Sequence, residues 1–244
     1  MEPSRQQIQN SEERMRIRTE YERRRSLTTE DNRYSFFNPA YQFEIYQRQK
    51  ATTDFLRKLG IRSLVDKKLL EVGCGRGDIL FEYMTLRMPT PALYGMDLLP
   101  ERVAYAHNRF QTANILNGEA ENLPYKDNTF DLVVQYTVFS SILSDAMKSQ
   151  VASEMLRVLN KSNGLILWYD FWLNPSNPQT RGVRPDEIRR LFPGCTFHFR
   201  KVTLAPPLAR RTVKVSWILS EILEKLTILN SHYLVAIRPD SSRL

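Results

Sequence analysis

Residues 69–80 read LLEVGCGRGDIL, an apolar run that passes directly into three glycines at alternate positions. Such a turn either lets a ligand approach the main chain closely or only reverses the chain direction. The dinucleotide-binding fingerprint places its third glycine three residues after the second, where this chain has Asp78. The Lys–Ser/Thr pair of a phosphate-binding P-loop does not follow the glycines either. The stretch therefore predicts a strand, a tight turn and a helix, and it disfavours a nicotinamide-dependent oxidoreductase.

Six further strand patterns follow this stretch. Continuous apolar runs bounded by turns are typical of strands that are buried on both faces. Strands and helices alternate over most of the chain, which favours right-handed crossovers and a parallel sheet. The seven predicted strands are residues 68–73, 92–98, 113–120, 130–138, 164–171, 195–207 and 232–239.

Two helical segments precede the first strand. Residues 1–33 are strongly charged and hold few apolar positions, which predicts an arm or lid instead of a core element. Asn38-Pro39 marks the start of the second helix, because proline favours the first helical position, and Gly60 ends it. We therefore divide the chain into a helical arm or lid, residues 1–59, and a main domain, residues 60–244.

The composition limits the class of protein. A chain of 244 residues with 42% hydrophobic content supports one domain with a full core. It has two cysteines, Cys74 and Cys195, and no cysteine–histidine cluster, which disfavours a disulfide framework and a zinc site. Neither a signal peptide nor an apolar run of membrane-spanning length is recognised. We expect a cytoplasmic protein, a monomer or homodimer, without a transmembrane segment.

The formal net charge of +8 is unevenly distributed. Residues 181–214 hold nine Lys or Arg against two acidic residues, so this stretch could contact an anionic acceptor or form an ordinary solvated surface. The last predicted helix, residues 216–229, could lie on a membrane, but its apolar side chains are more simply explained as covering the sheet. These side chains are Ile218, Ile222, Leu223, Leu226 and Leu229.

Three acidic residues lie at the carboxyl ends of strands one to three. Glu71, two residues before Gly73, could accept a cationic group or orient the turn. Asp97 lies about 20 residues after Gly77, the spacing at which an acidic residue binds both hydroxyls of a ribose. The alternative for Asp97 is an N-terminal cap of the helix that follows. Glu119 could accept a hydrogen bond from an exocyclic amine, or be an ordinary surface residue.

The order of these motifs resembles class I S-adenosylmethionine-dependent methyltransferases over residues 60–240. It comprises Glu71-x-Gly-x-Gly-x-Gly77, Asp97, GEAENLP, NTFDLVVQYTV and EMLRVLNKSNGLILWYDF. FDLVV preceded by LPYKDNT is similar to the quinone-biosynthesis branch, and further stretches resemble a bacterial subgroup of small-molecule methyltransferases. The resemblance implies a Rossmann-like α/β fold: a seven-stranded, mostly parallel sheet with a reversed last strand, helices on both faces and an N-terminal helical lid.

The resemblance also implies S-adenosylmethionine as cofactor, with S-adenosylhomocysteine as its product and no metal. Glu71 would orient the turn and the methionine amino group, Asp97 would hold the ribose, and Glu119 would contact the adenine edge. Many relatives have Asp at the position of Glu119. The cofactor-binding residues carried over are Glu71, Gly73, Cys74, Gly75, Gly77, Asp97, Leu98, Glu119, Ala120 and Gln135.

Methyl transfer from a sulfonium is an in-line displacement, in which alignment of the acceptor contributes most and a general base helps a hydroxyl acceptor. We predict Asp170, at the end of strand five among aromatic residues that would raise its pKa, as the base or acceptor-orienting group, with Tyr136 second. The histidines, His107, His198 and His232, are predicted to be structural. The residues predicted to line the acceptor pocket under the lid are Tyr34, Phe37, Tyr41, Phe139 and Tyr169.

The predicted function is methylation of a small-molecule acceptor, a hydroxyl or amine of a secondary metabolite or glycoconjugate precursor, with an anionic or lipid-linked acceptor left open. An RNA methyltransferase is one alternative. Adenine-N6 enzymes carry an Asn/Asp-Pro-Pro-aromatic run after strand four, and this chain has QYTVFSS there. We therefore expect no nucleic-acid partner. A non-catalytic cofactor-binding or interaction module is the other alternative.

Overall fold

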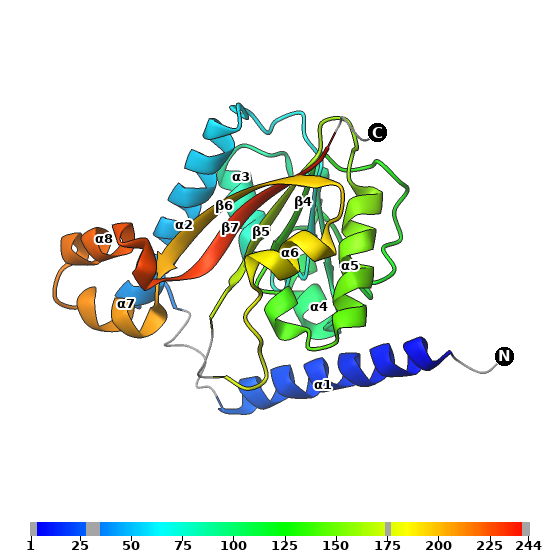
Figure 1. Cartoon of the computed structure of the whole chain (residues 1–244), viewed down its shortest axis with the longest axis horizontal. Helices are drawn as coiled ribbons and strands as arrows, with labels where there is room; N and C mark the ends of the chain where they lie inside the picture. Colours follow the sequence, from blue (N-terminus) through cyan, green and yellow to red (C-terminus); the bar gives the residue numbers. More distant parts are fainter. Residues whose placement is uncertain (1–3, 28–34, 174–176, 241–244) are drawn as a thin grey trace.

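A computed structural model describes residues 4–27, 35–173 and 177–240, and Figure 1 shows a central twisted sheet with helices on both faces. The strands lie in the order β3-β2-β1-β4-β5-β7-β6. The last strand, β7, is antiparallel to both of its neighbours, and the other pairs are parallel. The predicted seven-stranded sheet with a reversed last strand is confirmed. The strands are β1 (Leu69–Val72), β2 (Leu93–Asp97), β3 (Asn114–Asn117), β4 (Leu132–Tyr136), β5 (Leu165–Phe171), β6 (Cys195–Leu204) and β7 (Asn230–Pro239).

Helices cover the two faces of the sheet separately, because successive side chains of a strand point to opposite faces. Leu69 packs with α2, α3 and α4, whereas its neighbour Leu70 packs with α5 and α6. Both side chains are fully buried, as the continuous apolar strand patterns predict. The helices are α1 (Arg5–Leu27), α2 (Pro39–Lys58), α3 (Asp78–Thr85), α4 (Pro100–Arg109), α5 (Asp145–Val158), α6 (Pro185–Leu191), α7 (Pro206–Thr212) and α8 (Trp217–Lys225).

The second helix starts where the sequence predicts. The side chain of Asn38 accepts a hydrogen bond from the backbone N–H of Ala40 at 3.1 Å, and Pro39 occupies the first helical position. Near the other end, Phe55 and Leu56 are buried in the core on one face of the sheet. Thus α2 packs in the same core as the strands that follow it, and the division of the chain after residue 59 stays a prediction.

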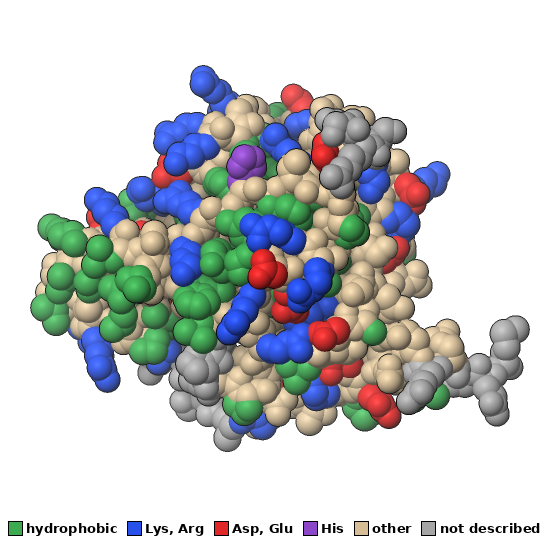
Figure 2. All heavy atoms as spheres, viewed as in Figure 1, with side chains coloured by type: hydrophobic (Ala, Val, Ile, Leu, Met, Phe, Trp, Pro, Cys, Tyr) green, Lys and Arg blue, Asp and Glu red, His purple; other side chains and the backbone are tan. Residues whose placement is uncertain are grey.

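Helices α7 and α8 follow β6 and precede β7 in the chain, and they lie beyond the carboxyl end of β6. Leu223 and Leu229 pack against a small cluster that includes Phe43 of α2. In contrast, Ile218, Ile222 and Leu226 are exposed, and Figure 2 shows hydrophobic side chains gathered over this end of the molecule. The prediction that these three side chains cover the sheet is wrong, because α8 sits beyond the end of the sheet and not over its face.

Candidate active site

The glycine turn joins β1 to α3, where it packs tightly and borders a cavity. Gly73 and Gly77 have φ angles of +75° and +79°, which L-residues with a side chain rarely adopt. A Cβ at Gly77 would lie 2.5 Å from Phe110 Cε2, so packing alone requires glycine there. A Cβ at Gly73 would lie 2.4 Å from Val138 Cγ2, and Gly73 also lines a cavity. The turn therefore packs tightly, and at Gly73 it presents bare main chain to the cavity.

The cavity lies at the carboxyl ends of β1, β2 and β4, the edge at which open α/β sheets bind ligands. Figure 1 shows α1 running across this edge of the molecule. Three residues of α1, Arg14, Ile17 and Tyr21, form part of the cavity wall. The residues of the sequence prediction that line it are Gly73, Asp97, Leu98, Ala120 and Tyr136.

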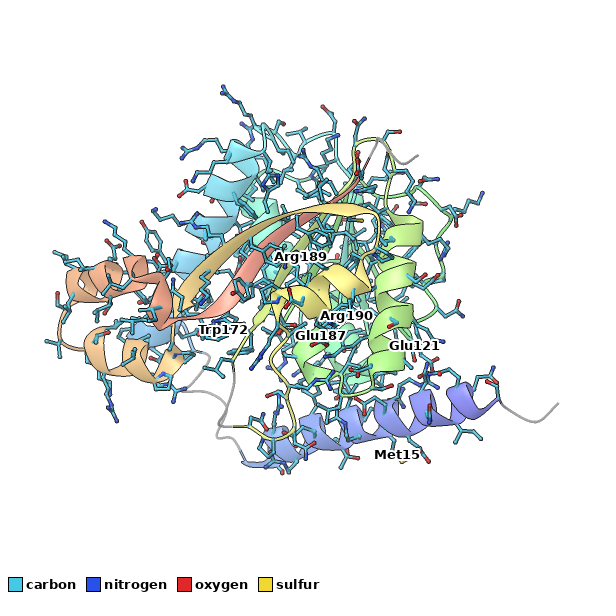
Figure 3. The ribbon with its side chains drawn as sticks, in the orientation of Figure 1. Met15, Glu121, Trp172, Glu187, Arg189 and Arg190 are labelled. Carbon is cyan, nitrogen blue, oxygen red and sulfur yellow. The ribbon has the colours of Figure 1, made fainter. Side chains whose placement is uncertain are left out.

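Polar contacts hold α1 over the cavity. Arg14 pairs with Glu119 at 3.0 Å and with Glu121 at 2.5 Å. The guanidinium of Arg102, on α4, lies 4.3 Å from the centre of the Tyr21 ring. Met15 points away from the body of the molecule in Figure 3, so α1 presents its opposite side to the cavity. Sequence reasoning predicted a lid but missed Arg14 and Glu121.

Asp97 connects the first two strands at the cavity. Its Oδ2 accepts a hydrogen bond from the backbone N–H of Gly75 at 2.8 Å, and its Oδ1 accepts one from Leu99 at 2.9 Å. Leu99 is the residue that precedes α4, and the helix has no side-chain cap. Asp97 is therefore not the N-terminal cap of α4. Burial raises the pKa of Asp97, although both backbone hydrogen bonds favour the ionised form.

Glu71 lies at the end of β1, directly before the turn, and is almost completely buried. Its Oε2 has no hydrogen-bond partner among the residues that the structure describes. Burial raises the pKa of Glu71 well above its usual value, and the nearby carboxylates of Glu82, Asp78 and Asp97 add to this effect. An unpaired buried carboxyl group is costly unless a ligand satisfies it. Glu71 thus has the surroundings of a ligand-binding group.

Three other predicted cofactor residues have mainly structural contacts. The Cys74 thiol is buried against Gly95 of β2, and burial raises its pKa. Gln135 accepts a hydrogen bond from the backbone N–H of Val138 at 3.0 Å. Glu119 is half exposed and bound by Arg14, so its contact with an adenine edge stays a prediction.

The two predicted catalytic residues lie at the carboxyl ends of neighbouring strands, β5 and β4. The Asp170 carboxylate accepts hydrogen bonds from the backbone N–H groups of Ser140 at 3.0 Å and Phe171 at 2.8 Å, and burial raises its pKa to about 6. The Tyr136 hydroxyl lies 3.2 Å from that of Tyr83, and burial raises its pKa to about 12. Tyr136 is therefore protonated at neutral pH, and the catalytic roles of both residues stay predictions.

The structure does not gather the five predicted acceptor-pocket residues around one cavity. Tyr34 lies outside the described residues. Phe37 is 98% exposed, and Tyr41 packs its ring edge-on against Phe36 with centroids 5.8 Å apart. This exposure contradicts the prediction that Phe37 lines the acceptor pocket. The turn before α2 lies on the surface and carries the side chain outward.

The other two are core residues. Phe139 is fully buried, with its ring centroid 4.3 Å from Trp168. Tyr169 is also buried; its hydroxyl bonds Thr203 at 2.8 Å, and its ring stacks on His232 at 4.5 Å. Neither ring borders the cavity under α1, because each faces a packed neighbour on its own side of the sheet.

A buried polar cluster beside Tyr136 was not recognised in the sequence. Arg48 of α2 pairs with Glu82 of α3, and its guanidinium lies 5.8 Å from the ring centres of both Tyr136 and Tyr169. A second cavity lies between α2 and α3, and Glu82 and Tyr136 line it. Tyr136 consequently borders both cavities. Burial and the charge of Arg48 lower the pKa of His232 to about 3, so the imidazole is neutral.

Comparison with known proteins shows which family part of the chain resembles. Residues 70–167, from β1 into β5, match the family model described as a methyltransferase domain. This part of the chain is therefore similar to a methyltransferase domain. Its extent covers the glycine turn, Asp97 and Tyr136, and the predicted resemblance to S-adenosylmethionine-dependent methyltransferases is confirmed.

Two curated relatives share this part of the chain. Phthiotriol/phenolphthiotriol dimycocerosates methyltransferase 1 of Mycobacterium ulcerans is 32% identical over 122 residues, which are 47% of this chain and 40% of the relative. The ubiquinone/menaquinone biosynthesis C-methyltransferase of Geobacter sulfurreducens is 28% identical over 155 residues, which are 61% of this chain and 56% of the relative. The chain thus spans about half the length of the curated relatives it matches.

Among solved structures, the geranyl diphosphate C-methyltransferase of Streptomyces coelicolor has the same fold as this chain. The TM-score is 0.54 at 14% identity, with 77% of this chain and 76% of the other covered. That enzyme was solved with Mg2+, geranyl diphosphate and S-adenosyl-L-homocysteine. Over its described ranges, the present chain has no group of three or more His, Cys, Asp or Glu side chains that could hold a metal ion.

Proposed function

We propose that the protein transfers a methyl group from S-adenosylmethionine to a small-molecule acceptor. The observation that carries this proposal is the buried Oε2 of Glu71, which has no partner in the described part of the chain and lies two residues before Gly73 of the cavity wall. The methionine end of the cofactor bears an ammonium group. A cation that approaches the bare main chain of the turn would pair with this carboxylate and remove the cost of its burial.

Asp97 fits the ribose end of the cofactor. A carboxylate offers about four lone-pair sites, and two of them are occupied by the backbone N–H groups of Gly75 and Leu99. The remaining sites suit two vicinal hydroxyl donors. Leu98 and Ala120 supply apolar wall for an adenine ring. These residues support S-adenosylmethionine as the ligand of the cavity.

The residues of the chain itself position the acceptor against the cofactor and exclude water from the cavity. The cofactor supplies an activated methyl group and a leaving group that needs no protonation. Side chains that align the acceptor with the cofactor can provide about 7–11 kcal/mol of the barrier reduction. Helix α1 supplies part of the cavity wall through Arg14, Ile17 and Tyr21. In this position the helix would keep water away from the bound cofactor and limit its hydrolysis.

We place the acceptor in the second cavity, between α2 and α3, because Tyr136 borders both cavities. Its hydroxyl is protonated at neutral pH and can donate a hydrogen bond to an acceptor oxygen or nitrogen. The names of the similar proteins refer to phthiotriol dimycocerosates, to ubiquinone and menaquinone, and to geranyl diphosphate. They support a largely apolar acceptor, and we retain a hydroxyl or amine as the predicted site of methylation.

The test is a transfer assay with methyl-labelled S-adenosylmethionine. We expect label to enter the organic phase when the protein is incubated with hydroxylated quinones or a bacterial lipid extract, and Glu71→Gln to lower the rate. Label that enters added RNA instead, or no transfer by a protein that binds the cofactor, would contradict the proposed acceptor class.

The same assay tests the predicted role of Asp170 as the base, which is a separate question because Asp170 lines neither cavity. A carboxylate base must be ionised, so the rate should rise with pH through about 6, the pKa of Asp170. Asp170→Asn should remove this rise as well as lower the rate. If the rise persists in Asp170→Asn, the carboxylate serves only to hold the backbone of Ser140 and Phe171.

A further inference from the structure

The end of the molecule formed by α7 and α8 carries a hydrophobic surface, which we call the α8 patch. Ile228, Val215 and Ile218 are 81%, 80% and 70% exposed. Single exposed apolar residues are ordinary, but a contiguous group marks an interaction site. Figure 2 shows hydrophobic side chains gathered at this end of the molecule. The α8 patch consists of Val215, Ile218, Leu219, Ile222, Leu226 and Ile228.

Helix α8 is apolar on two sides, and only one of them is buried. Trp217 packs edge-on against Phe43 at 5.1 Å, and Leu223 joins the same cluster. Ile218 and Ile222 are four residues apart and share the outer face. Nothing in the described ranges of the chain covers this outer face.

The charge around the α8 patch is positive. Arg210, Arg211 and Lys214 lie on α7 and the turn after it, and Lys225 ends α8; all four are exposed. Two half-buried acidic residues on α8 balance only part of this charge. A second copy of the chain would bring the same positive groups against these, whereas an anionic lipid surface would neutralise them.

Two more exposed aromatic residues, Phe36 and Phe37, lie just before α2. This helix packs against α7, and its Phe43 contacts Trp217. Exposed aromatic side chains next to apolar and basic ones are typical of segments that lie in a membrane interface. None of the helices described is long and apolar enough to cross a bilayer, which limits the contact to the interface.

We propose that the α8 patch docks the protein on the surface of an anionic membrane. The patch follows the carboxyl end of β6, the same edge of the sheet as the candidate site. Tyr46, in the wall of the second cavity, lies 6.0 Å from the Trp217 ring at the start of α8. Docking brings the second cavity beside the lipid, so the acceptor is drawn from the bilayer; this consequence rests on the proposed function.

The test uses the full chain and vesicles of equal parts phosphatidylcholine and phosphatidylglycerol, with phosphatidylcholine vesicles as the uncharged comparison. We expect the wild type to co-sediment with the anionic vesicles and to be released by high salt. Ile218→Glu should bind about tenfold or more weakly, because it loses the burial of one isoleucine in lipid. Val65→Glu is the matched control: it puts the same charge on an exposed apolar residue at the opposite edge of the sheet, and should bind like the wild type.

Wild-type protein that stays in solution with anionic vesicles overturns the proposal, and so does equal binding of Ile218→Glu and the wild type. Sedimentation that shows a dimer which Ile218→Glu dissociates would assign the patch to a second copy of the chain. Since vesicle binding is measured without cofactor or acceptor, its failure is distinguishable from a failure of methyl transfer.

Discussion

Asp97→Asn is expected to weaken S-adenosylmethionine binding roughly 100-fold or more. Hydrogen bonds to a charged group contribute about 1.5–3 kcal/mol each, and the variant loses the charge that both ribose hydroxyls would contact. In the wild type, the backbone N–H groups of Gly75 and Leu99 each donate to one carboxylate oxygen of Asp97. In the variant, the asparagine NH2 faces one of these two N–H groups, so that hydrogen bond is lost. Isothermal calorimetry measures the loss directly.

The control for Asp97→Asn is Asp186→Asn, which removes a carboxylate from the exposed side of α6. Its affinity should equal that of the wild type. A thermal melt of Asp97→Asn shows whether the protein is still folded. A folded Asp97→Asn protein with wild-type affinity would remove Asp97 from the cofactor site.

Arg48→Met is expected to lower the free energy of unfolding by about 3–5 kcal/mol, because it leaves a buried carboxylate without its partner. Glu82 is 9% exposed and pairs with Arg48 across α2 and α3. The double variant Arg48→Met/Glu82→Met should recover most of the loss, since two apolar side chains can replace a buried pair. Chemical denaturation of the three proteins gives the coupling energy.

The effect of Arg48→Met should depend on pH. Burial already raises the pKa of Glu82 with Arg48 present, and removal of the arginine raises it further. A carboxyl group whose pKa is higher in the folded state stabilises the fold below its unfolded pKa and loses this contribution as pH rises through the folded value. The deficit of Arg48→Met should therefore be small in mild acid and grow toward neutral pH.

Arg57→Met provides the matched comparison on the same helix. Arg57 is largely exposed and pairs with Asp54. Its replacement should therefore lower the free energy of unfolding by less than about 1 kcal/mol, both in mild acid and at neutral pH. Equal losses for Arg48→Met and Arg57→Met would show that the buried pair contributes no more than a surface one.

The strands were predictable because their side chains obey a local rule. Leu69 and Leu70 point to opposite faces, and both faces are covered, so the run is apolar throughout. The start of α2 at Asn38 was predictable for a similar reason, because a cap and a proline act within one turn. The position of the glycine turn was predictable because an apolar strand precedes it and a helix follows it directly in the sequence.

Contacts between distant segments could not be predicted in this way. Arg14 meets Glu121 across 107 residues, and the charged pattern of α1 does not say which arginine faces the sheet. Arg48 is one of many basic residues of the N-terminal segment, and its burial depends on where α3 places Glu82. The apolar residues of α8 indicate a buried face, but periodicity alone does not say that Ile218 lies beyond the end of the sheet.

The central claim is that the cavity bounded by Gly73, Asp97 and α1 binds an adenosyl sulfonium. Titration of the full chain with S-adenosylhomocysteine in a calorimeter tests it most directly, because the product binds without turnover. We predict saturable heat with one site per chain, lost in Asp97→Asn and retained in Asp186→Asn. Folded wild-type protein that gives no heat with either the product or S-adenosylmethionine would contradict the account.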